Sequence, residues 1–163
     1  MSSEPPVRRL RDPYREDETG WISFGAFLII AAVIYLITPN IVQEVEAFVR
    51  DFRLVEVFPN FWWFIPSTNH PVLYNAATQF CYAFGVVQIG VLGLRFARRS
   101  SIHGKAETLS SVIFWLGTGY LLTLLSQGVF SSWLSFIGAF VILVGISIVV
   151  RALVMTLAHR GPP

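Results

Sequence analysis

The stretch TLSSVIFWLGTGYLLTLLSQGVFSSWLSFIGAFVILVGISIVV, residues 108–150, decides the fold because it contains no charged residue. As a single helix at about 1.5 Å per residue it would measure about 65 Å, roughly twice the thickness of a bilayer's hydrocarbon core. The chain must therefore fold back within it, and the polar, glycine-containing SQGVFSS at 126–132 is the place for the turn. The stretch predicts two membrane-spanning helices.

Two further charge-free stretches, Gly20–Thr38 and Val72–Leu94, are also long enough to cross a bilayer. Charged residues make up 13% of the chain, against about 25% in a typical soluble domain. We therefore predict an all-α integral membrane protein that forms a four-transmembrane-helix bundle. The predicted segments are a charged tail (1–19), the first span (20–38), an amphipathic helix (39–57), an aromatic, proline-rich interface loop (58–70), the second span (71–96), a basic loop (97–105), the third span (106–126), a short turn (127–131), the fourth span (132–156) and a C-terminal tail (157–163).

The distribution of Lys and Arg predicts how the chain is oriented. All but two of the twelve lie in the tails, in the loop after the second span or at the adjacent span ends, and Arg50 and Arg53 are the exceptions. Because Lys and Arg near span ends favour the cytoplasmic side, we expect both termini in the cytoplasm and residues 39–70 outside. The expected location is the cell membrane or an equivalent organellar inner membrane.

The outward segment begins with an amphipathic pattern. At 100° per residue, apolar side chains from Ile41 to Val55 fall on one face and charged ones on the other, with Pro39 at the start and Pro59 at the end. This predicts a helix that lies on the membrane surface or across the outer ends of the spans. Such a helix could be a lid on its own bundle or a surface for a partner.

The aromatic sequence FPNFWWFIPSTNHP follows at residues 58–71. Tryptophan is enriched at membrane interfaces, because its ring is apolar and its N–H seeks water. We expect an interface belt here, with a docking site for a partner as the alternative. The residues concerned are Phe61, Trp62, Trp63, Phe64 and His70.

Small residues at regular spacing mark expected helix contacts within the membrane, since close packing holds helices together in lipid. They are expected to face neighbouring helices of the same bundle, or else a second copy or another subunit. The stripes are Ala76, Ala83, Gly90 and Ala97 in the second span and Ser131, Ser135, Gly138 and Gly145 in the fourth.

Uncharged polar residues in the second span form two sets. Asn75, Gln79 and Tyr82 share one face, while Gln88 lies nearly opposite. Buried amides need partners. We expect hydrogen bonds between helices, for example to Thr118 in the third span, and the alternative is a polar path or a site for a quinone-type head group.

Ionisable residues lie only at the ends of the spans. Arg95, Glu107 and Arg151 all map to the cytoplasmic interface, where Glu107 could pair with Arg95 across the short loop. We expect these charges to be structural, since ionisable groups that serve as ion or proton gates usually lie deeper.

Catalytic, cofactor and metal sites are not expected. Cys81 is the single cysteine, so no thiolate pair can form, and His70 is predicted on the opposite side of the membrane from His103 and His159, so the three histidines cannot jointly ligate a metal or haem within one chain. Sequence motifs for hydrolases, zinc proteases and phosphate loops are missing. No nucleic-acid partner is expected.

These patterns favour a non-catalytic structural or accessory subunit of a membrane complex. Its expected partners are the lipid bilayer and other membrane subunits, or further copies of itself. One alternative is a small oligomeric transporter or channel with the polar residues of the second span along its route. The other is a subunit of a membrane oxidoreductase that contacts a quinone or haem held by a partner.

Overall fold

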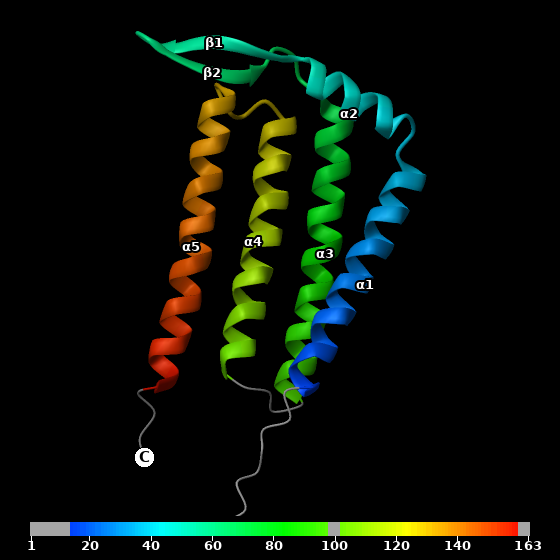
Figure 1. Ribbon diagram of the computed structural model, residues 1–163, viewed down its shortest axis with the longest axis vertical. Coiled ribbons are helices and arrows are strands. Elements are labelled where there is room, and N and C mark those ends of the chain that lie inside the picture. Colours follow the sequence, from blue (N-terminus) through cyan, green and yellow to red (C-terminus); the bar gives the residue numbers. More distant parts are fainter. Residues whose placement is uncertain (1–13, 98–101, 160–163) are drawn as a thin grey trace, which may run out of the picture.

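The computed structural model describes residues 14–97 and 102–159. Four long helices, one short helix and a two-stranded hairpin make up this part of the chain (Figure 1). In chain order they are α1 (Tyr14–Ile37), α2 (Ile41–Arg50), β1 (Phe52–Phe58), β2 (Phe61–Pro66), α3 (Pro71–Ala97), α4 (Ile102–Ser126) and α5 (Trp133–His159).

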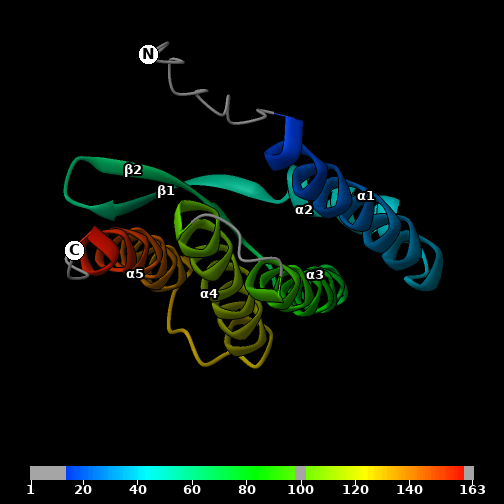
Figure 2. The ribbon, with the colours of Figure 1, turned by 90° about the horizontal axis from the view of Figure 1, so that it is seen from below.

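The helices α1, α3, α4 and α5 are each long and apolar enough to cross a membrane, which indicates a membrane location. They run side by side, with α2 and the hairpin at one end, called here the hairpin end. The start of α1 and the end of α5 lie at the opposite end, called here the termini end (Figure 1). Helices α3, α4 and α5 stand in a row and α1 leans on α3 (Figure 2).

Close contacts between α3 and α4 form the centre of the bundle. The Phe84 ring meets the edge of Trp115 at a centroid distance of 4.9 Å. At Gly85, a Cβ atom would lie 2.5 Å from Cδ2 of Leu116, so a larger residue would require the Leu116 side chain or the helices to shift. Phe27 of α1 packs edge-on against Phe84 at 5.7 Å, which attaches α1 to the same cluster.

The predicted small-residue stripes are only partly used within the chain. Ala76 is buried, whereas a Cβ atom at Gly90, Gly138 or Gly145 would meet no atom within 4 Å. The contact face of α3 instead follows Cys81, Phe84, Gly85, Gln88 and Val91, all buried. Those three glycines therefore do not pack against the described part of this bundle, and the alternative expectation, that they face a second copy or another subunit, stays a prediction. On α3 the reason is that large side chains form the contact face, which lies beside the small stripe.

The segment between α1 and α3 also differs from the prediction, so the fold is not purely helical. The amphipathic helix expected over 39–57 ends at Arg50, and most of the expected helix end and interface loop forms an antiparallel hairpin over 52–66. Residues 52–58 are rich in β-branched and aromatic types, which favour strands. Pro59 does not end a helix; together with Asn60, whose φ is 67°, it forms the turn between β1 and β2.

Candidate functional site

The platform, defined here as α2 and the hairpin (residues 41–66), is anchored by Asp51. Its Oδ2 atom accepts hydrogen bonds from the Thr68 backbone N–H at 2.6 Å and the Thr68 hydroxyl at 2.9 Å, and lies 3.2 Å from Nε2 of His70. Its backbone carbonyl accepts the Ser67 N–H at 3.3 Å. Asp51 thus joins the end of α2 to the segment that leads from β2 into α3.

Electrostatics keep the Asp51 anchor charged. The Thr68 backbone hydrogen bond lowers the pKa of this carboxyl below its ordinary 3.8; partial burial opposes this, and the Thr68 hydroxyl and the His70 ring lower the pKa further. The carboxylate is therefore ionised at neutral pH. The prediction missed Asp51, because in a continuous helix it would be one more charge on the polar face.

His70 is buried beside an aromatic cluster at the hairpin end of the bundle. Phe48 of α2 meets the His70 ring edge-on at 5.3 Å and also contacts Tyr74 of α3 and Trp133 of α5. The His70 carbonyl accepts the Tyr74 N–H at 3.0 Å at the start of α3. This cluster ties the platform to two of the long helices. The described residues contain no group of three His, Cys, Asp or Glu side chains placed to hold a metal.

The hairpin carries exposed aromatic side chains on both of its faces. Residues directly opposite one another in an antiparallel pair share a face, so Leu54 lies beside Phe64, and Val55 beside Trp63. On the first face Trp62 is 54% and Phe64 62% exposed; on the second Phe61 is 46% and Trp63 44% exposed. The rings of Phe61 and Trp63 stack at 5.8 Å. The hairpin extends over the start of α5 (Figure 1).

The polar residues of α3 divide between an outer and an inner face. Asn75, Gln79 and Tyr82 are exposed, whereas Gln88 is buried. The Tyr82 hydroxyl lies 3.4 Å from Oγ1 of Thr123, which is the one helix-to-helix hydrogen bond that joins these residues to α4 within the described chain. The expected bond to Thr118 is not formed, since its hydroxyl is buried without a partner among the described residues.

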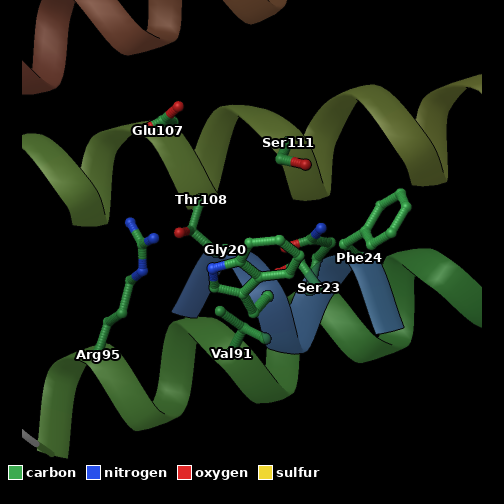
Figure 3. Close-up of a pocket in the computed structure, with 10 residues that line it drawn as sticks. Gly20, Ser23, Phe24, Val91, Arg95, Glu107, Thr108 and Ser111 are labelled. Atoms are coloured by element: carbon green, nitrogen blue, oxygen red, sulfur yellow. The ribbon is translucent and has the colours of Figure 1, made fainter. Parts of the chain in front are cut away.

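At the termini end, an open groove of about 710 Å³ lies between α1, α3 and α4 (Figure 3). Arg95 and Glu107 both line it, but no ion pair joins them within the described residues. The expected pairing was wrong because an Nη1 hydrogen of Arg95 is donated instead to the Gly104 carbonyl in the first turn of α4. Arg151 lies half-buried on α5, outside the groove.

Comparisons with protein-family models, with curated proteins and with solved structures give no significant match. The functional argument therefore rests on this chain's own residues and on the two surfaces described above, the platform and the groove.

Proposed function

We propose that the chain is a non-catalytic accessory or structural subunit of a membrane protein complex and that its hairpin docks a partner. The observation that carries the proposal is the exposure of aromatic residues on both hairpin faces. A hairpin that lies on a bilayer can bury one face in lipid, so the other face would remain in water. Exposed apolar patches of this kind mark interaction surfaces.

The attachment of the platform supports the same proposal. Asp51 fixes the hairpin to the start of α3 by hydrogen bonds, and Phe48 packs α2 against Tyr74 and Trp133. A surface held in this way loses little conformational entropy when it binds, which favours docking.

The orientation is part of the proposal. We place the termini end in the cytoplasm and the platform on the outer side, because in the sequence Lys and Arg are concentrated near the start of α1, around the connection from α3 to α4 and near the end of α5, whereas Arg50 and Arg53 are the two in the platform. The partner would then be met at the outer surface.

Purification of the tagged full chain from its native membrane in mild detergent, followed by mass spectrometry, tests the proposal. Two variants address the faces separately: Trp62→Ala with Phe64→Ala, and Phe61→Ala with Trp63→Ala. Tyr120→Ala is the matched control, since this aromatic side chain is 58% exposed on α4.

We expect wild-type chain and control to retain a stoichiometric partner and one of the two face variants to lose it, because hot-spot aromatics dominate interface energies. The variant of the lipid-facing side should keep the partner. A wild-type chain that purifies without a stoichiometric partner, or a partner retained by both face variants, would contradict the proposal.

A second candidate is an oligomeric transporter or channel, favoured by the position of Asn75 and Gln79 on the outer face of α3. From there they could line a route only between copies of the chain. Replacing both with Leu should then abolish flux in proteoliposomes and leave the helical content unchanged. Unaltered flux would exclude this candidate.

A further inference from the structure

The groove at the termini end is lined by charged, amide and aromatic side chains, with the charged ones at its mouth and the amide deeper. Arg95 lies in the last turn of α3, and Gln88 lies seven residues earlier, about 10 Å deeper along the helix. Trp21 and Phe24 supply aromatic surface from α1. A groove with charges at its mouth and apolar surface beyond suits an amphipathic ligand, and its volume of about 710 Å³ is within the usual range of small-molecule sites.

One donor in the groove lacks a partner, and an amide lies deeper. The Nε atom of Arg95 is buried with no partner among the described residues. Gln88, which is 7% exposed, lines the groove further along α3. Buried polar groups without hydrogen bonds are costly, so a ligand that accepts hydrogen bonds at both levels would stabilise this arrangement.

The two charged side chains at the mouth of the groove, Arg95 and Glu107, are of opposite sign and do not form an ion pair with each other. Arg95 rises from α3 toward α4, where Glu107 and Thr108 lie (Figure 3). Lys105 is not a groove residue, since its Nζ lies over the Phe96 ring at 4.7 Å. Among the described residues, the groove therefore offers one cation, Arg95, and one anion, Glu107, which together are complementary to a zwitterion.

We propose that this groove binds one membrane phospholipid whose head group combines a phosphate with a primary amine. The phosphate accepts hydrogen bonds from Arg95, and the ammonium group donates to the Glu107 carboxylate. Deeper in the groove, the Gln88 amide donates to an ester carbonyl, while the acyl chains extend along Trp21 and Phe24 into the bilayer. The inference does not depend on partner docking at the hairpin.

Native mass spectrometry of the full chain in mild detergent tests this site. Dioleoylphosphatidylethanolamine and dioleoylphosphatidylcholine are titrated separately, and the one-to-one adducts are counted. The two lipids differ in that the choline nitrogen has no N–H to donate to Glu107. We expect the ethanolamine lipid to bind about tenfold more tightly, the difference that one charge-assisted hydrogen bond supplies.

Three variants separate the contributions. Glu107→Gln should reduce the preference for the ethanolamine lipid to near unity, and Gln88→Leu should weaken both lipids alike. Glu56→Gln, which removes a hairpin carboxylate far from the groove, is the control and should keep the preference. Glu107 has no hydrogen bond or ion pair among the described residues, so its replacement is expected to leave the fold intact.

Several results would overturn the proposal. These are equal binding of the two lipids by the wild-type chain, an unchanged preference in Glu107→Gln, and a statistical spread of lipid adducts with no one-to-one species. A purified chain that retains a quinone and shows no head-group preference would assign the groove to a different ligand. Loss of the hairpin partner would leave all of these outcomes unaffected.

Discussion

Gly85→Ala probes the contact between α3 and α4 on which the bundle depends. The added Cβ would lie 2.5 Å from Cδ2 and 3.0 Å from Cγ of Leu116. Ordinary carbon contacts are about 3.5–4.0 Å, so Leu116 must change its position or the helices must separate. Overpacking of this kind costs about 1–3 kcal/mol.

Gly90→Ala is the matched control, because it lies on the same helix and its Cβ would meet no atom within 4 Å. The change in helix propensity from Gly to Ala, up to about 1 kcal/mol, is common to both variants and cancels in their difference. We therefore expect Gly85→Ala to be less stable than Gly90→Ala by about 1–3 kcal/mol.

The assay is equilibrium unfolding in mixed micelles of mild detergent and dodecyl sulfate, followed by circular dichroism. Both variants should have the helical content of the wild-type chain before unfolding. Equal stability of the two variants would refute the α3–α4 packing described here, and a less stable Gly90→Ala would show that the small-residue stripe of α3 carries the contact.

Three further outcomes are expected. Asp51→Asn removes the carboxylate that accepts both Thr68 hydrogen bonds, so limited proteolysis should cut the hairpin faster while the long helices stay intact; an unchanged rate would contradict the anchor. The pKa of Asp51 is lowered below 3.8 in the folded chain, so the stability that its carboxylate contributes is present above that value and is lost as the pH falls through the folded-state pKa. Proteolysis of the hairpin by an acid-active protease should therefore rise only in strong acid. A rise between about pH 5 and 8 would be inconsistent with this. Tyr82→Phe deletes one hydroxyl contact of 3.4 Å, and Thr123 still donates to the Gly119 carbonyl. The free energy of unfolding should therefore fall by about 0.6 kcal/mol or less, and a fall of more than about 2 kcal/mol would contradict the weak role of this pair.

The long helices could be predicted from sequence because one property, the length of a charge-free stretch, determines them. A charge-free stretch of about 20 residues has few alternatives to a spanning helix, since lipid satisfies no backbone hydrogen bonds. Residues 108–150 predict two such helices for this reason, and the structure has α4 and α5 there.

The hairpin could not be predicted in the same way, because over a short stretch the same apolar residues can fit both the two-residue period of a strand and the 3.6-residue period of a helix. Phe52 and Val55 fit the apolar face of a continuing helix as well as they fit a strand. What distinguishes the two is Asp51, whose partners Thr68 and His70 lie 17 and 19 residues further along the chain. Such a contact is visible only after folding.

The contact face of α3 was also beyond the sequence pattern. Gly85 and Gly90 are both small residues on one helix, but Leu116 of α4 meets only the first. Spacing identifies candidate stripes, whereas the bulky neighbours on the facing helix decide which stripe is used. The groove depends in turn on how α1 leans on α3, which no local pattern in α1 specifies.

Site-specific photo-crosslinking in the native membrane tests the central claim, that the hairpin docks a partner protein, most directly. A benzophenone amino acid is placed at Trp62 or Trp63 on the two hairpin faces, and at Val141, which is exposed on α5, as the control. We predict that one hairpin position forms a discrete adduct with another polypeptide, while Val141 yields lipid adducts. Lipid adducts alone at both hairpin positions would contradict the claim and leave the hairpin as a membrane-interface belt.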